Sequence, residues 1–413
     1  MSADSYSALA SRNYRLYLSG NVLSVLGVWI QRLALGWHAW QLSESALIVG
    51  LVAAAQFLPL VFLTPFFGVL VDQISTRGAA IVMHIILALI AGFLGALTLA
   101  GHMTTEWLIT LAFMHGLANS AYSPVRLALI PDLVDKQKFP SAVAISSMVF
   151  NTSRFIGPGV AGFVVAWYGL SAAYLINAVT YLPVIFVLFF LRIARHEPHP
   201  SSRNPYLEQL KEGVRYTRDH APIRQVILLA GVSTFFGRGI LELMPAFAAI
   251  TFDGGSTALA TLMAAAGIGA IGASLLMSAR RFHSNLHALV VVGAIGVAAS
   301  ILLFAGSRHL VTGSVVVAML GFFSSLVSVG SQTEVQIHVE NRLRGRVMSL
   351  WTLTLVGGPA IGSVVGGALA GRIGSTWTSV AFAVACGTLI AAVGTGRPHS
   401  PEMADTGSSV GGD

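Results

Sequence analysis

Five charged residues lie inside long apolar segments of this sequence: Arg32, Arg154, Arg238, Glu242 and Glu334. A charge at the centre of a lipid bilayer costs at least about 2.5 kcal/mol, so a charged side chain there faces a cavity or an oppositely charged partner. Arginine can bind an anion, and a desolvated carboxylate can carry a proton. These residue types therefore predict a polar site inside an otherwise apolar protein.

Arg238 and Glu242 are four residues apart, which places them one turn apart on the same face of a helix. Burial favours the neutral form of Glu242 and the neighbouring arginine favours its ionised form, so Glu242 is the first candidate for a proton-carrying group. A permanent salt bridge between the two residues explains the spacing equally well. Glu334, which lies between Gln332 and Gln336, is the second candidate, although it can instead stabilise one mouth of the protein.

Arg32 lies near the middle of the first apolar segment, close in sequence to Gln31 and His38. It either contacts an anionic ligand in a cavity or forms a buried structural ion pair with a carboxylate. His84 and His115 stand alone in apolar segments, where we expect satisfied core histidines rather than proton carriers.

The composition indicates which kind of protein holds these charges. Of the 413 residues, 55% are hydrophobic and 10% are charged, and the mean hydropathy is +0.75. Soluble domains carry roughly 25% charged residues. Because a membrane-spanning helix needs about 20 apolar residues, we predict an all-α integral membrane protein with about twelve transmembrane helices. The predicted spans lie at residues 16–42, 47–71, 79–101, 107–127, 141–167, 171–193, 223–251, 259–278, 286–305, 312–338, 347–370 and 378–393.

The basic residues of the loops predict how these spans are oriented. Cytoplasmic loops carry an excess of lysine and arginine. With both termini in the cytoplasm, only Arg308 and Arg372 fall in outer loops. The net charge of +7 follows this loop pattern rather than a basic face, so it does not indicate a nucleic-acid-binding domain.

A polar stretch divides the spans into two sets of six, and part of it has the pattern of an amphipathic helix on the cytoplasmic surface. Its apolar face carries Leu207, Leu210 and Val214, beside the basic residues Lys211, Arg215 and Arg218. The predicted domains are an N-terminal six-helix bundle (1–193), a cytoplasmic linker with this surface helix (194–222), a C-terminal six-helix bundle (223–396) and a disordered cytoplasmic tail (397–413).

A glycine-proline pair followed by another glycine occurs in the fifth and in the eleventh predicted span. The two copies are Gly157-Pro158 with Gly162 and Gly358-Pro359 with Gly362. Such weak internal symmetry is expected of transporters built from repeated bundles. The copies differ three residues before the pair, where the first has Arg154 and the second has Leu355.

Seven motifs spread along the chain carry a resemblance to a known family. They are Trp29-Ile30-Gln31-Arg32 with Ala34 and Trp37, Gln56-Phe57-Leu58-Pro59, Gly68-Val69-Leu70-Val71-Asp72 with Arg77, Ser123-Pro124-Val125-Arg126, Pro131-Asp132-Leu133-Val134, Arg154-Phe155-Ile156-Gly157-Pro158 and Leu343-Arg344-Gly345-Arg346-Val347-Met348-Ser349. Together they resemble the major facilitator superfamily, and within it the drug and siderophore exporter branch, also called the enterobactin exporter-like or transmembrane secretion effector group.

The resemblance implies the major facilitator fold and assigns roles to three groups of residues. A central cavity lined by helices 1 and 7 would hold the substrate or proton site at Arg32, Gln31, His38, Arg238, Glu242 and Glu334. A cytoplasmic gate that latches the bundles would contain Gly68, Asp72, Arg77, Arg126, Arg344 and Arg346, although Gln73 stands where the family commonly has an arginine. A motif similar to the helix-5 motif of exporters comprises Arg154, Gly157, Pro158 and Gly162, where we expect Arg154 to tie the bundles together rather than to contact substrate.

Other chemistries find no support in the residues. The sequence has no Walker-type loop, and Cys386 is its only cysteine, so it has no cysteine pair. It also has no converging set of nucleophiles or metal ligands, so we expect neither an enzyme nor a bound metal or cofactor. The expected function is proton-coupled export, by a monomer and through alternating access, of small amphipathic or anionic compounds of the drug or siderophore type. The expected location is the bacterial cytoplasmic (inner) membrane. An importer or uniporter of the same fold and a non-transporting membrane sensor or scaffold remain alternatives.

Overall fold

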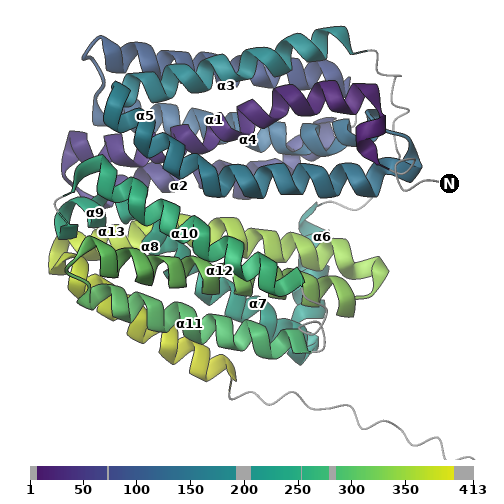
Figure 1. Ribbon diagram of the computed structural model, residues 1–413. Helices are drawn as coiled ribbons and strands as arrows, with labels where there is room; N and C mark the ends of the chain where they lie inside the picture. Colours follow the sequence, from purple (N-terminus) through teal and green to yellow (C-terminus); the bar gives the residue numbers. More distant parts are fainter. Residues whose placement is uncertain (1–6, 72–73, 192–205, 253, 279–284, 395–413) are drawn as a thin grey trace, which may run out of the picture.

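The computed structural model describes the chain except for residues 1–6, 72–73, 192–205, 253, 279–284 and 395–413. Two bundles of long, roughly parallel helices lie side by side (Figure 1). The N bundle contains α1 (Arg12–Ser43), α2 (Ala46–Val71), α3 (Thr76–Leu99), α4 (Thr105–Asp132) and α5 (Phe139–Phe190), with the short η2 (Ala8–Ala10) and η3 (Lys136–Lys138). The C bundle contains α7 (Ala221–Ser233), η4 (Thr234–Arg238), α8 (Gly239–Glu242), α9 (Met244–Phe252), α10 (Gly255–Ser278), α11 (Leu286–Gly306), α12 (Leu310–His338) and α13 (Asn341–Gly394).

The membrane spans follow from the length and hydropathy of these helices. Nine segments of the described chain are long and apolar enough to cross a membrane. Two of them, α5 and α13, hold two spans each, because the chain turns back at Gly169 (φ 80°) and at Gly374 (φ 81°). Positive φ values of this kind favour glycine, which has no Cβ atom. With α4 the spans number twelve, which confirms the predicted all-α membrane fold; the predicted disordered tail lies outside the described residues.

The seventh span is interrupted, whereas the sequence predicted a continuous one over residues 223–251. Between α7 and α8 the chain forms the π-helical turn η4, and Leu243 (φ −88°, ψ 0°) separates α8 from α9. A π-helical turn widens the helix by one residue per turn and occurs frequently at functional sites. The turn ends at Arg238, four residues before Glu242.

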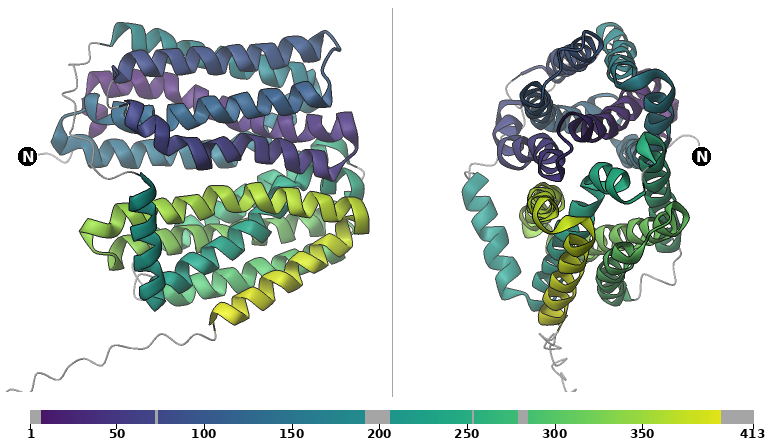
Figure 2. Two further views of the ribbon diagram at one scale, coloured as in Figure 1. Left: turned by 180° about the vertical axis from the view of Figure 1, so that it is seen from behind. Right: turned by 90° about the vertical axis from the view of Figure 1, so that its left-hand side faces the viewer.

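Helix α6 (Tyr206–Asp219) runs across one end of the C bundle rather than along it (Figure 2). Gly213 packs so closely on α13 that a Cβ atom there would lie 2.7 Å from the backbone oxygen of Arg346. Glu212 also forms an ion pair with Arg346. Val214 is 47% exposed, whereas Thr217 is buried.

The two bundles meet most closely at the end opposite α6, which we call the far end; the other is the α6 end. Three contacts of small residues bring the helices together there. A Cβ atom on Gly50 would lie 2.3 Å from the oxygen of Ser363, one on Gly367 2.4 Å from the oxygen of Ala46, and one on Gly162 1.8 Å from the Cβ atom of Ala260. Ser363 also donates a hydrogen bond to the oxygen of Gly50 (3.2 Å). The far end is therefore closed by nearly direct backbone contact between α2 and α13 and between α5 and α10.

Candidate functional site

A cavity of about 100 Å³ lies between the bundles, halfway along the helices. Its walls come from α1, α2 and α5 of the N bundle and from η4, α8, α9, α10 and α12 of the C bundle. Most of the lining is apolar. The polar and aromatic residues among it are Trp29, Arg32, Gln56, Arg154, Arg238, Glu242, Ser324 and Ser325.

Arg32 on α1 forms an ion pair with Glu242 on α8, so the pair joins the two bundles. The guanidinium carbon of Arg32 also lies 5.0 Å from the ring centroid of Trp29 and 4.4 Å from that of Phe57. Aromatic faces attract cations at such distances. The carboxylate of Glu242 is thus paired with Arg32, 210 residues away, and not with Arg238, the partner that the helical spacing suggested.

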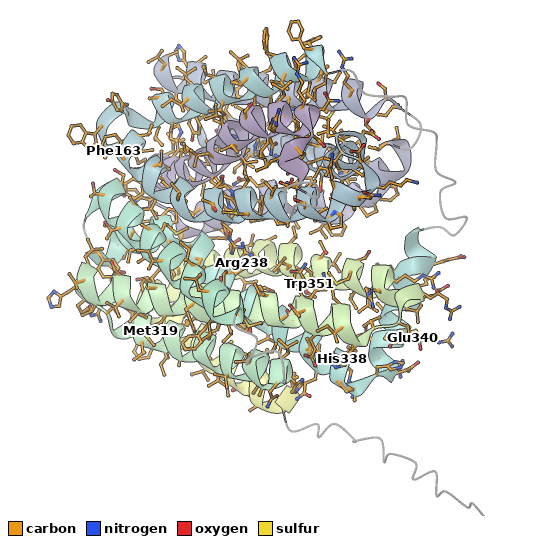
Figure 3. All side chains as sticks on the ribbon, turned by 45° about the vertical axis from the view of Figure 1, so that its right-hand side comes forward. Phe163, Arg238, Met319, His338, Glu340 and Trp351 are labelled. Carbon is orange, nitrogen blue, oxygen red and sulfur yellow. The ribbon has the colours of Figure 1, made fainter. Side chains whose placement is uncertain are left out.

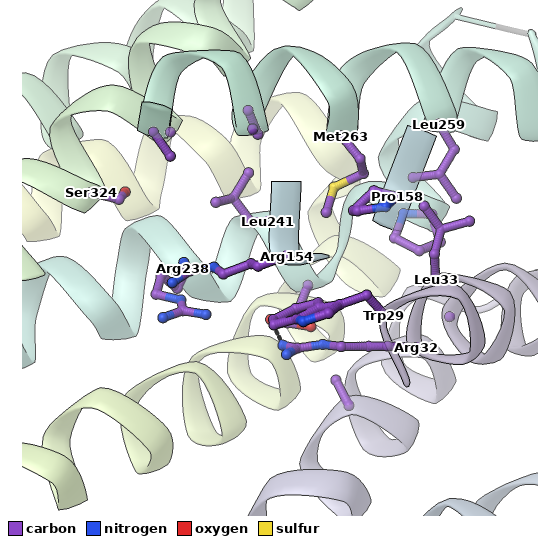
Figure 4. Close-up of a pocket in the computed structure, with 18 of the residues that line it drawn as sticks. Trp29, Arg32, Leu33, Arg154, Pro158, Arg238, Leu241, Leu259, Met263 and Ser324 are labelled. Atoms are coloured by element: carbon purple, nitrogen blue, oxygen red, sulfur yellow. Dashed lines mark hydrogen bonds and ion pairs between the residues drawn. The ribbon is translucent and has the colours of Figure 1, made fainter. Parts of the chain in front are cut away.

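Arg154 on α5 and Arg238 at the end of η4 face the same cavity. Figure 4 shows their side chains reaching toward each other from opposite bundles, and Figure 3 places Arg238 on the face of the C bundle that turns toward the N bundle. They are close enough for their positive charges to repel each other. Arg154 therefore lines the cavity at the interface between the bundles.

The described lining residues carry three arginines and one carboxylate. The ion pair of Arg32 with Glu242 cancels one charge of each sign, which leaves the charges of Arg154 and Arg238 in excess. Guanidinium groups bind carboxylates and phosphates through paired N–H donors, so such an excess favours an anionic ligand.

Two further hydrogen-bond donors of the lining have no protein partner. The indole Nε1 of Trp29 and the hydroxyl of Ser324 are buried, and neither makes a hydrogen bond within the described structure. A buried donor without an acceptor is costly, and it is commonly satisfied by water or a ligand.

Three of the six predicted cavity residues, Arg32, Arg238 and Glu242, line the cavity, and the other three lie elsewhere. Gln31 is fully buried within the N bundle, where it accepts a hydrogen bond from Asn177 (2.7 Å). His38 is also buried there, with its Nδ1 atom 3.1 Å from the hydroxyl of Tyr174. Glu334 lies near the α6 end of α12, with its Oε1 atom 3.6 Å from Nδ1 of His338.

The two lone histidines occupy the interior of the N bundle. His84 contacts the backbone oxygen of Ala80 through Nδ1 (2.7 Å), and its ring packs edge-to-face against Tyr122. His115 is buried beside Asn119, whose side-chain nitrogen lies 3.2 Å from Nε2. Both have local partners, as expected of core histidines.

The predicted gate residues make their contacts within single bundles. Arg77 donates from Nε to the backbone oxygen of Leu188 (2.7 Å) at the end of α5, and Arg126 lies over the ring of Phe150 (5.9 Å). In the C bundle, Arg344 donates to the oxygen of Val339 (3.3 Å), and Arg346 is paired with α6. Asp72 lies outside the described residues, and the space beside Gly68 is open.

The helix-5 motif faces the interface between the bundles and also α1. Pro158, one turn after Arg154, lines the cavity with it. A Cβ atom on Gly157 would lie 2.4 Å from the Cβ atom of Trp29, so this glycine lets α5 approach α1 at the cavity wall. Gly162, one turn further on, makes the close contact with α10 described above.

Sequence reasoning assigned no cavity role to Trp29, Gln56, Ser324 or Ser325, although all four line the cavity. Trp29 and Gln56 belong to the motifs of helices 1 and 2, which was the only available signal. The two serines lie in an apolar helix where serine is common, and nothing in their spacing distinguishes them. Among the described residues, no group of three or more His, Cys, Asp or Glu side chains is placed to hold a metal ion.

The sequence model of one protein family, described as transmembrane secretion effector, matches residues 3–409. The chain belongs to this family of the major facilitator superfamily. A transmembrane secretion effector of this fold is a multi-pass integral membrane protein that transports small molecules, and it is not an enzyme.

Two relatives of this transmembrane secretion effector are named for siderophores. The chain is 23% identical over 346 residues to the staphyloferrin A transporter of Staphylococcus aureus. The aligned region covers 81% of this chain and 84% of the relative. The chain is 31% identical over 269 residues to the enterobactin exporter of Escherichia coli. The aligned region covers 63% of this chain and 61% of the relative.

Two solved structures show the fold that this transmembrane secretion effector shares. A nucleoside transporter superposes with a TM-score of 0.71 at 15% identity, over 92% of this chain and 99% of the other. A bacterial homologue of the human lysosomal transporter Spinster, solved in an inward-facing and unoccupied conformation, also gives 0.71, at 16% identity over 93% and 97%. At such identities the likeness concerns the fold alone.

Proposed function

We propose that this transporter exports small anionic compounds of the siderophore type. The observation that carries the proposal is the charge balance of the cavity, where three arginines face one carboxylate. A charge inside a membrane protein marks a substrate or ion path when it faces a cavity, and an excess of guanidinium groups selects negative charge. The apolar remainder of the lining suits the carbon framework of an amphipathic ligand.

The relatives support the substrate class and the direction. One is named as a transporter of staphyloferrin A and one as an exporter of enterobactin. The helix-5 motif, which resembles that of exporters, contributes Arg154 and Pro158 to the cavity wall. These observations favour export over import or uniport within the same fold.

We propose that the α6 end faces the cytoplasm of a bacterium and that both termini lie there. The basic loop residues gather at this end, as the positive-inside rule requires. The far end is closed by backbone contacts between the bundles, which supports uptake of substrate from the α6 end. A single chain contains both halves of the cavity, which is consistent with a monomer.

We also propose that protons drive the export and that Glu242 carries them. Its carboxylate faces Arg32 and lies within electrostatic reach of Arg154 and Arg238. When Glu242 is protonated, its ion pair with Arg32 is lost, and with it one link between the bundles. Proton binding can thereby bias the two conformations of an alternating-access transporter.

The test is transport by the purified protein in liposomes that contain a pH gradient, with staphyloferrin A and enterobactin as probes. We expect accumulation on the side of the far end, loss of transport in Arg238→Gln, and retained binding but no response to the pH gradient in Glu242→Gln. Transport of neutral or cationic compounds in preference to both probes would contradict the substrate class. A Glu242→Gln protein that still responds fully to the gradient would contradict the role of Glu242.

A further inference from the structure

The two uncompensated arginines of the cavity come from opposite bundles. Arg154 is on α5 of the N bundle and Arg238 is at the end of η4 in the C bundle. Figure 4 shows their side chains converging. Resting on the proposed function, we infer that Arg154 and Arg238 form a clamp for a dianionic group of the substrate, such as two neighbouring carboxylates, and that this group is required for efficient closure of the α6 end.

The charge of the clamp follows from its neighbours. Arg32 is neutralised by Glu242, and among the described cavity residues Arg154 and Arg238 have no carboxylate of their own. A monoanion leaves one positive charge of the clamp uncompensated, whereas a dianion neutralises both. The preferred ligand group therefore has two negative charges within the reach of two guanidinium groups.

The clamp links ligand binding to the position of the bundles, because each bundle supplies one of its charges. Closing the α6 end removes water from around two like charges, and burial of unpaired like charges is unfavourable. A ligand shifts a conformational equilibrium only by its difference in affinity for the two states. A dianion held between the arginines has such a difference, because it removes the repulsion between Arg154 and Arg238 that opposes closure.

The internal repeat supports a clamp with one arginine from each bundle. The position in the C bundle that matches Arg154 is Leu355, which packs against the apolar core. The second arginine comes instead from the interrupted seventh span, directly at the end of its π-helical turn.

The clamp can be tested without the natural substrate by measuring the distance between the bundles. Leu70 on α2 and Ile337 on α12 are exposed and lie toward the α6 end, one in each bundle. Replacing both by cysteine in a Cys386→Ala background allows spin labelling of the full chain and measurement by double electron–electron resonance. In the absence of ligand, Arg154→Gln and Arg238→Gln should each raise the ratio of closed to open protein by roughly fivefold or more. The matched variants Arg154→Lys and Arg238→Lys keep the positive charge, so without ligand they should change this ratio less than the glutamine variants do.

A second arm measures the ligand charge with citrate as a probe carrying several carboxylates and acetate as a probe carrying one, at equal ionic strength. Citrate should increase the closed fraction of the unmodified protein and should have no such effect in Arg154→Gln, while acetate should have little effect in either. An unchanged closed fraction in the glutamine variants, equal effects of lysine and glutamine, or equal effects of citrate and acetate would each overturn the clamp. Because the first arm needs neither transport nor protons, it can succeed or fail independently of the proposed export.

Discussion

The side chain of Arg32 on α1 is ion-paired with Glu242 on α8, so that a charge of one bundle neutralises a charge of the other. The two side chains are 20% and 15% exposed, and the rings of Trp29 and Phe57 lie beside the guanidinium group. The aromatic rings therefore hold the guanidinium group in addition to the carboxylate.

The effects of replacing Arg32 and Glu242 on stability should not be additive, because the two side chains form an ion pair. Glu242→Gln leaves Arg32 without its carboxylate in a largely buried place, so it should lower stability by about 1 to 3 kcal/mol. Arg32→Gln should lower stability by less, because Glu242 stays within electrostatic reach of Arg154 and Arg238. In the double variant neither charge is left alone, and the loss should be smaller than the sum of the two. Thermal unfolding of the detergent-purified proteins measures this, and strictly additive losses would show that the two residues do not interact.

The close contact between α5 and α10 should not accept a methyl group. A Cβ atom on Gly162 would lie 1.8 Å from the Cβ atom of Ala260, whereas one on Gly159 would lie 4.0 Å from that of Ala264. Gly162→Ala should therefore cost about 1 to 3 kcal/mol through overpacking. It should also weaken the closure of the far end, which accessibility of cysteines placed there to a membrane-impermeant reagent would show. Gly159→Ala is the matched control, and equal tolerance of both changes would contradict the described contact.

The turn between the fifth and sixth spans should require glycine. Gly169 has φ 80° and ψ 176°, a conformation that costs other residues about 1 to 3 kcal/mol. The Cβ atom itself has open space around it, so the loss in Gly169→Ala should come from the backbone alone. Gly371→Ala, where the space is also open and φ is not positive, should not lower the melting temperature. Similar melting temperatures for the two variants would show that the turn is not strained.

The ion pair between Glu212 and Arg346 should hold α6 against the C bundle. An exposed pair of this kind contributes about 0.2 to 1 kcal/mol, so Arg346→Gln should speed amide hydrogen exchange in α6 by at most about fivefold. Arg342→Gln, at a neighbouring exposed residue, serves as the control. An α6 that exchanges at the same rate in both variants would mean that the packing of Gly213 alone holds the helix.

The membrane fold could be predicted because every span has an apolar run that locates it and is flanked by loops whose charge orients it. The apolar runs gave helices whose ends agree with the structure to within a few residues, and the glycine-proline repeat indicated two bundles. The interruption of the seventh span was not predictable, because the residues of Thr234–Arg238 have no feature that excludes an ordinary helix. Its π-helical turn depends on how the span packs against its neighbours.

The site was predictable in its charges but not in its pairing. A charge inside an apolar span must be compensated, and this rule found Arg32, Arg238 and Glu242. Which arginine pairs with Glu242 depends on contacts between residues 210 positions apart, while helical spacing reports only on neighbours. Arg154 was expected at the interface and also lines the cavity, since Pro158, one turn later, lies on the same face.

The excess positive charge of the cavity also has a consequence for energy supply. In alternating access, a group that is wetted from one side and then from the other experiences the full electrical potential across the membrane. Each elementary charge moved in this way is worth about 2.3 kcal/mol per 100 mV. With a bound dianion the clamp is neutral, so the loaded step is nearly insensitive to voltage. Under the proposed orientation, the emptied transporter would carry both charges of Arg154 and Arg238 back toward the cytoplasm, and a membrane potential that is negative inside would pull them in that direction.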